Sequence, residues 1–199
     1  MLPVKLFTKL SAFLITLGGV PAAADSFSDR LVQAAIERTT HEIEYDGSYY
    51  AIEYPGGDIP SDRGVCTDVL IRSYHKLGID LQREVHEDIA LNFEAYPSRR
   101  IWGLAAPDTN IDHRRVPNLQ VFFGRKGTSI PITQSPEDYR PGDLVTWMLP
   151  GNLPHIGIVT DHRGPDTATP FVVHNIGAGP KHEDILFKYE ITGHFRYEP

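Results

Sequence analysis

The sequence predicts an α+β domain in which N-terminal helices pack on a mostly antiparallel sheet. Apolar residues recur at helical spacing in the first half of the chain, whereas runs rich in Val and Ile occupy the last third, from Leu144 onward. Helices and strands that are segregated along the chain favour this class over a parallel sheet built from alternating strands and helices.

The first 24 residues have the features of a cleavable signal peptide. Lys5 and Lys9 supply positive charge, residues 10–20 form an apolar run, and three alanines at 22–24 suit cleavage before Asp25. The apolar run is shorter than the roughly 20 residues that cross a bilayer, and no later segment is long enough. We therefore expect a periplasmic or secreted protein with no membrane span after cleavage.

The rest of the chain, residues 25–199, has the length of one domain. Without Lys5 and Lys9 it carries 17 basic and 26 acidic side chains. This acidic balance argues against nucleic acid as a partner.

Two helices are predicted from periodicity, and a third is shorter. Residues 26–39 form an amphipathic stripe that a serine at 26 or 28 can cap. Residues 66–77 place Cys66, Val69, Leu70 and Ser73 on one face, and Gly78 stops the helix. The third helix covers residues 84–93. We expect structured loops at residues 45–64 and irregular chain at residues 96–115.

Four strands are predicted after the turn at Pro141-Gly142. They cover residues 144–148, 156–160, 171–173 and 192–197, which are rich in β-branched and aromatic side chains. No internal repeat is present in the sequence.

Cys66 is the only cysteine of a chain that we expect to be exported. Exported thiols are normally paired in disulfides, so a single one suggests a nucleophile. A helix N-terminus lowers a thiol pKa from about 8.5 into the range of roughly 3.5 to 7.5, and Gly64 allows a tight turn before the helix. The alternative is that Cys66 is a small buried packing residue.

Histidines near two strand ends supply the other groups of a catalytic site. His155 begins the strand His-Ile-Gly-Ile-Val, and His174 and Asn175 follow the strand Phe-Val-Val. We interpret His155 as the general base and His174 as the residue that orients it, with Asn175 as the alternative. No two histidines have the i, i+4 spacing of a zinc helix, so we expect neither a metal nor another cofactor.

This order of motifs resembles the NlpC family of papain-fold cell-wall peptidases, over roughly Tyr54 to His174. The motifs are a cysteine at a helix start, then Pro-Gly-Asp-Leu-Val, His-Ile-Gly-Ile-Val and Val-Val-His. In that family a tyrosine twelve residues before the nucleophile helps to form the oxyanion pocket. Tyr54 stands twelve residues before Cys66, and the resemblance implies this role for it.

The sequence is also similar, over nearly all of residues 25–199, to an exported bacterial family of unassigned function, numbered 1287 among such domains. The segments that carry this similarity are residues 64–69, 110–119 and 173–177. Two departures from the NlpC pattern affect the expected substrate. Val65 replaces the usual Asp before the nucleophile, and Thr67-Asp68 replaces the usual Ser-Gly after it.

The resemblance implies a papain-like hydrolase that cleaves amide bonds of peptidoglycan stem peptides by Cys-His-His catalysis. An amidase or acyl transferase acting on another envelope substrate is one alternative, and a non-catalytic module that binds wall peptides or regulates a hydrolase is another. Asp112, Arg114 and Arg115 lie in the densest polar cluster. Its arginines could clamp carboxylates of an acidic stem peptide, or the cluster could be a loop held by internal ion pairs.

Overall fold

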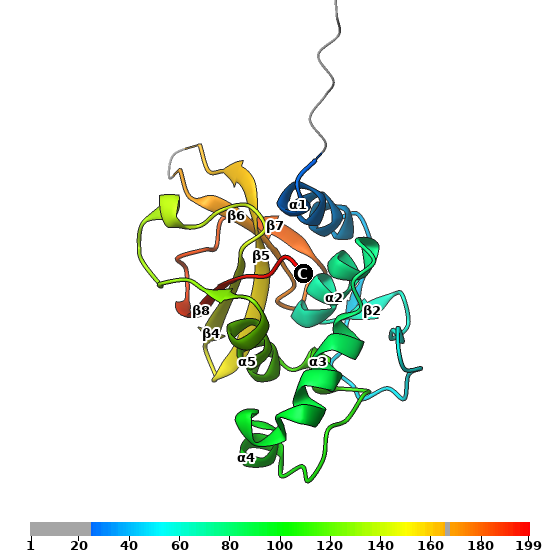
Figure 1. Ribbon diagram of the computed structural model, residues 1–199. Coiled ribbons are helices and arrows are strands. Elements are labelled where there is room, and N and C mark those ends of the chain that lie inside the picture. The colour runs from blue at the N-terminus through cyan, green and yellow to red at the C-terminus, as the bar shows by residue number, and fades with distance from the viewer. Residues whose placement is uncertain (1–24, 166–167) are drawn as a thin grey trace, which may run out of the picture.

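A computed structural model describes residues 25–165 and 168–199. The expected signal peptide, residues 1–24, lies outside the described residues. The described chain has the predicted α+β class, with helices gathered beside a six-stranded sheet in which every pairing is antiparallel (Figure 1).

Five α-helices occupy the first two thirds of the described chain. Ser26 caps the first, and its hydroxyl accepts a hydrogen bond from the Asp29 amide. Asp80 caps the third in the same way, which explains why that helix begins at Leu81 rather than at the expected Glu84. The bounds are α1 Phe27–Arg38, α2 Cys66–Lys76, α3 Leu81–Leu91, α4 Ser98–Trp102 and α5 Val116–Lys126.

The large sheet has the strand order β3-β8-β4-β5-β6-β7. Its four longest strands overlap the four that the sequence predicted, although β8 ends at Arg196, one residue before the predicted end. Two further strands, β1 Glu44–Tyr45 and β2 Arg63–Gly64, form a separate parallel pair within the expected loop region. The bounds in the large sheet are β3 Thr128–Ser129, β4 Leu144–Leu149, β5 Leu153–Arg163, β6 Pro170–His174, β7 Lys181–Glu183 and β8 Glu190–Arg196.

Each face of the sheet buries its own set of side chains, because successive strand residues point to opposite faces. Ile156, Ile158 and Val173 pack into the larger core with residues of the helices. Trp147 and Val172 pack on the other face, in a smaller core closed by the segment that follows β7. The indole nitrogen of Trp147 donates to the Leu186 carbonyl and fixes that segment to the sheet.

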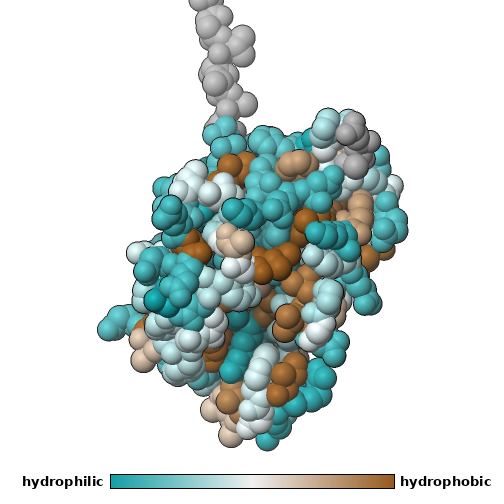
Figure 2. Space-filling model, turned by 180° about the vertical axis from the view of Figure 1, so that it is seen from behind, coloured by the Kyte–Doolittle hydropathy of each residue, from teal (hydrophilic) through white to brown (hydrophobic). Residues whose placement is uncertain are grey.

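Among the described residues, no helix combines the length and the apolar character that a membrane span requires. On the face of the molecule seen in Figure 2, hydrophobic residues form a broken band through the middle, and hydrophilic residues dominate the margins.

Candidate functional site at the first turn of helix α2

The N-terminus of α2 is built by the backbone on either side of Cys66. Val65 is extended, with φ −119°, and its amide donates to the Asp68 carboxylate at 2.7 Å. This carboxylate takes the place of a side-chain cap at Val65, which has no polar side chain. Cys66 is therefore the first helical residue, as the sequence predicted.

The Cys66 thiol is buried, and this overturns the expected low pKa. Only 5 % of the residue is exposed, and it belongs to the larger core. Burial raises the pKa of the thiol to about 12, although the amides of Ile156, Thr67 and Cys66 itself act to lower it. The effect of the helix N-terminus is thus outweighed by the loss of solvation of a thiolate.

His155 and His174 are brought together by the neighbouring strands β5 and β6. Nε2 of His155 lies 3.2 Å from Nδ1 of His174, and the two rings are nearly perpendicular. Both residues are buried. Burial, and then the charge of His174, lower the pKa of His155 to about 3, so its imidazole is neutral at pH 7.

The structure brings the sulfur to the backbone beside His155 rather than to its ring. The Ile156 amide lies close enough to the Cys66 sulfur to act against the rise of the thiol pKa. Within the described chain, no hydrogen bond joins Cys66 to the imidazole of His155, which lies beside His174 and Trp147. Strand pairing sets the His155 ring beside Trp147, on the face of the sheet that buries the smaller core, whereas Cys66 belongs to the larger core on the other face.

Asn175 lies beside the candidate site but does not contact His155. Its side-chain nitrogen donates to the Gly64 carbonyl at 3.4 Å, and its side-chain oxygen accepts from the Gly177 amide at 3.0 Å. Of the two residues considered as partner for His155, His174 is the one that contacts it. Asn175 instead ties the end of β6 to the strand that leads into α2.

Tyr54 lies against α3. Its ring packs edge-on against His86, with the ring centroids 5.0 Å apart. Partial burial and then the charges of Glu87 and Asp80 raise the pKa of its phenol. These neighbours belong to the start and body of α3, and Cys66 is not among the groups that influence Tyr54.

A different tyrosine, Tyr45, is influenced electrostatically by Cys66. Partial burial raises the pKa of the Tyr45 phenol, and the charge that Cys66 would carry as a thiolate and the charge of Asp68 raise it further. The parallel pairing of β1 with β2 sets Tyr45 opposite Gly64, two residues before Cys66. Sequence analysis missed Tyr45 because its position depends on this pairing, which no local pattern reveals.

The Arg114 side chain is held by bonds to other residues of the protein. Its guanidinium forms an ion pair with Asp68 at 2.9 Å, both side chains being almost fully buried, and it also donates to the carbonyls of Ser48 and Asp46. Because these bonds occupy the guanidinium, the geometry gives no support to a substrate clamp at Arg114. The ion-paired loop is the interpretation that fits.

Asp112 and Arg115 are also engaged within the protein. The buried Asp112 carboxylate accepts from the Asp108 amide at 2.6 Å and lies 3.4 Å from Arg115. The Arg115 guanidinium is stacked over Trp102, 4.1 Å from the ring centroid. These contacts do not place either side chain next to Cys66.

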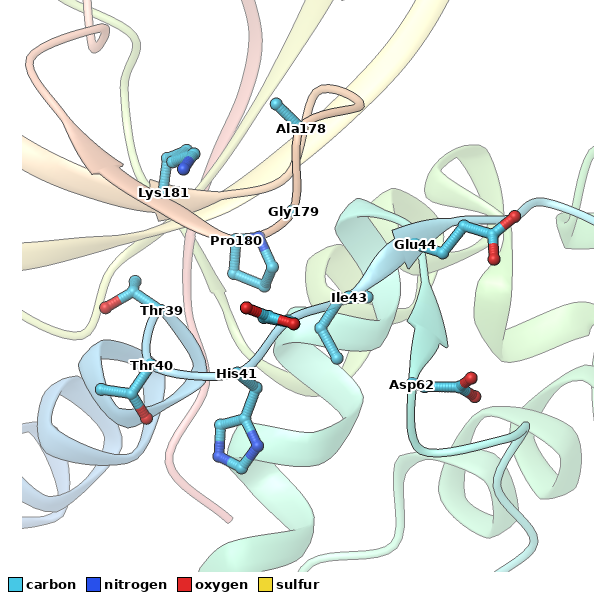
Figure 3. Close-up of a pocket in the computed structure, with 11 residues that line it drawn as sticks. Thr39, Thr40, His41, Ile43, Glu44, Asp62, Ala178, Gly179, Pro180 and Lys181 are labelled. Carbon is cyan, nitrogen blue, oxygen red and sulfur yellow. The ribbon is translucent and has the colours of Figure 1, made fainter.

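A surface hollow of about 550 Å³ lies outside the β1–β2 pair. Figure 3 shows Gly179 and Pro180 facing Ile43 across it, with Lys181 and Glu44 on separate sides. Cys66, His155 and His174 do not line this hollow. Within residues 25–165 and 168–199, no three His, Cys, Asp or Glu side chains are arranged to hold a metal ion.

Two comparisons with known proteins bear on the family. The chain is 51 % identical over 167 residues to the "Uncharacterized protein YijF" of Escherichia coli (strain K12), a match that covers 84 % of this chain and 80 % of that protein. A family model described as "Domain of unknown function (DUF1287)" matches residues 32–197. The chain therefore belongs to the DUF1287 family.

Proposed function

We propose that this protein is an exported cysteine hydrolase of the papain-like NlpC type that cleaves amide bonds in peptidoglycan stem peptides. The observation that carries the proposal is the meeting of three elements. Cys66 occupies the first turn of α2, and the amide of Ile156 is close enough to influence the pKa of its thiol. His155, the residue before Ile156, forms a buried pair with His174. Export to the periplasm or beyond rests on the signal peptide expected at residues 1–24.

In the proposed reaction the thiol and the imidazole are both neutral at rest, as expected from the raised pKa of Cys66 and the lowered pKa of His155. His155 takes the thiol proton through one bridging water as the sulfur attacks the amide carbonyl, so that the thiolate never has to persist in the buried site. The protonated His155 then passes its proton to the leaving amine, and water hydrolyses the thioester. No cofactor takes part.

Oxyanion stabilisation is assigned to the first turn of α2 and to Tyr45. The backbone amides of Cys66 and Thr67 lie close enough to the sulfur to lower its pKa. Donors of this kind stabilise the charge that develops on the carbonyl oxygen. Tyr45 takes the place that the twelve-residue spacing assigned to Tyr54, because Tyr45 is the tyrosine that is influenced by Cys66.

The second candidate is a non-catalytic module that binds wall peptides or regulates a hydrolase. It is favoured by one observation, the burial of Cys66 in the larger core. In this case the site would retain its shape without performing chemistry. The two candidates differ in what happens to wall material that is incubated with the protein.

The deciding experiment compares the wild type with Cys66→Ala and Cys66→Ser on purified peptidoglycan, with soluble products identified by mass spectrometry. We expect amide cleavage by the wild type alone, with all three proteins equally folded by thermal melting. Products that are the same for wild type and Cys66→Ala, or that are absent for both, would overturn the hydrolase. Cosedimentation of the protein with uncleaved wall would then support the binding module, and transfer of an acyl group to an added amine would identify an acyl transferase.

A further inference from the structure

A third polar side chain extends the histidine pair toward the surface. His174 Nε2 lies 3.5 Å from the carboxylate of Glu183, a residue of the edge strand β7. The two histidines are buried, whereas the Glu183 side chain is 50 % exposed. We propose that Glu183 is a positioning residue of the hydrolase, which sets the tautomer of His174 and through it the tautomer of His155. This inference rests on the proposed function.

Strand pairing places Glu183 on the correct face of the sheet. Glu183 is opposite Val172 in the antiparallel β6–β7 pair. Directly opposed residues share a face, and so do residues two apart on one strand, so Glu183, Val172 and His174 all project to the same side. The contact between Glu183 and His174 is therefore a diagonal cross-strand pair, which the register of β7 fixes.

His174 needs this carboxylate because its outer nitrogen has no other partner. Nε2 is buried and makes no hydrogen bond within the described part of the chain. At 3.5 Å the Glu183 oxygen is slightly beyond hydrogen-bond range. Since Glu183 is half exposed, a small rotation of its side chain closes the distance. A buried donor without a partner costs free energy, and a hydrogen bond to Glu183 removes this cost, so the contact is favoured.

The carboxylate of Glu183 can only accept a hydrogen bond. This determines which ring nitrogen carries the proton in His174 and, through it, in His155. His174 must carry its proton on Nε2, facing Glu183. Its Nδ1 is then a lone pair, which accepts the proton of His155 Nε2 across the 3.2 Å contact. The remaining nitrogen of His155, Nδ1, is left with a lone pair and can act as the base.

The opposite arrangement would inactivate the base. A proton on His174 Nδ1 would point at His155 Nε2 and place the proton of His155 on Nδ1. It would also set the lone pair of His174 Nε2 against the negative carboxylate, which is repulsive. Glu183 acts to raise the pKa of His174, against a larger lowering by burial and a smaller opposing effect of Lys188.

The test measures the tautomers directly, by long-range proton–nitrogen NMR of protein labelled with ¹⁵N-histidine. Signals are assigned with His155→Gln and His174→Gln. We expect protons on Nε2 of both rings in the wild type and in Glu183→Gln, whose amide oxygen can still accept. In Glu183→Ala we expect mixed tautomers of both rings. Unchanged tautomers in Glu183→Ala, or a wild-type His174 protonated on Nδ1, would overturn the assignment.

Hydrolysis of peptidoglycan gives the second readout. We expect kcat of Glu183→Ala to fall about tenfold with little change in KM, since a half-exposed, charge-assisted hydrogen bond contributes about that factor. Glu183→Gln should recover most of the loss. Glu190→Ala, which removes an exposed glutamate from β8 of the same sheet, is the control and should match the wild type. A wild type that cleaves nothing would end the hydrolase proposal, while the NMR result would still decide whether Glu183 sets the tautomers.

Discussion

The carboxylate of Asp68 and the guanidinium of Arg114 form an ion pair at 2.9 Å in which the two side chains are only 3 % and 2 % exposed. Asp68 also accepts the Val65 amide at the start of α2, and Arg114 also binds the segment at residues 46–48. One buried pair thus joins helix α2 to the segment that follows Tyr45. The position of the candidate site depends on it.

Arg114→Ala should destabilise the protein by about 3 to 5 kcal/mol, because it leaves the Asp68 charge buried without compensation. Thermal or urea unfolding measures the change. The matched control is Arg99→Ala, which breaks the exposed pair with Glu94, whose side chains are 60 % and 77 % exposed. That change should cost less than about 1 kcal/mol. Equal losses in the two variants would contradict a structural role for the buried pair.

The helices and strands that have a clear periodic pattern could be predicted from the sequence. Helix α2 and strands β4 to β6 lie where periodicity predicted them, because a buried face leaves a regular trace in the sequence. Helix α5 was missed although Val116, Leu119 and Phe123 have helical spacing. The Pro at its start and the Gly within it obscured that spacing.

The two residues that the proposals add to the site, Glu183 and Tyr45, owe their positions to pairing between strands. Strand β7 is only three residues long and contains no apolar residue, so nothing local reveals Glu183. Tyr45 sits in a two-residue strand within a loop-like region. The twelve-residue spacing points to Tyr54 instead, and the variants Tyr45→Phe and Tyr54→Phe test which of the two tyrosines acts at the site.

Two tyrosine variants test whether Tyr45 or Tyr54 stabilises the oxyanion. Tyr45→Phe should lower peptidoglycan turnover by about a hundredfold, as expected for loss of an oxyanion donor. Tyr54→Phe should have little effect, because its neighbours lie on α3. Steady-state kinetics on the same wall preparation measures both. The reverse order of effects would return the oxyanion role to Tyr54.

Cys66 should react slowly with iodoacetamide in the resting protein. A thiol pKa of about 12 leaves, at pH 8, roughly a thousandth of the thiolate of a free cysteine, and the side chain is also buried. We expect labelling at least about a hundredfold slower than in the urea-unfolded protein, with a rate that still increases above pH 9. Intact-protein mass spectrometry follows the reaction. Fast labelling below pH 7 would reveal a thiolate–imidazolium pair and would rule out the neutral resting state.

Acid should destabilise the fold through histidines that are buried in their neutral form. Burial, and then the charge of Arg114, lower the pKa of His113 to about 3, and burial and His174 do the same for His155. The unfolded chain binds these protons near pH 6.5, so stability is complete above that pH and is lost as the pH falls toward 3. Between pH 7 and pH 5, each of these two histidines should lower the free energy of unfolding by about 2 kcal/mol. The raised pKa of Asp112, caused mainly by its burial, opposes this trend at more acidic pH.

Urea unfolding at pH 5, 6 and 7 tests this linkage, with His113→Gln as the informative variant. Removing one neutral buried histidine should decrease the pH dependence by about one proton over this range, whatever the variant does to stability at pH 7. His75→Gln, on the exposed side of α2, is the control and should keep the wild-type dependence. If His113→Gln and the wild type lose stability in parallel, then His113 is protonated in the folded protein and the burial argument fails for it.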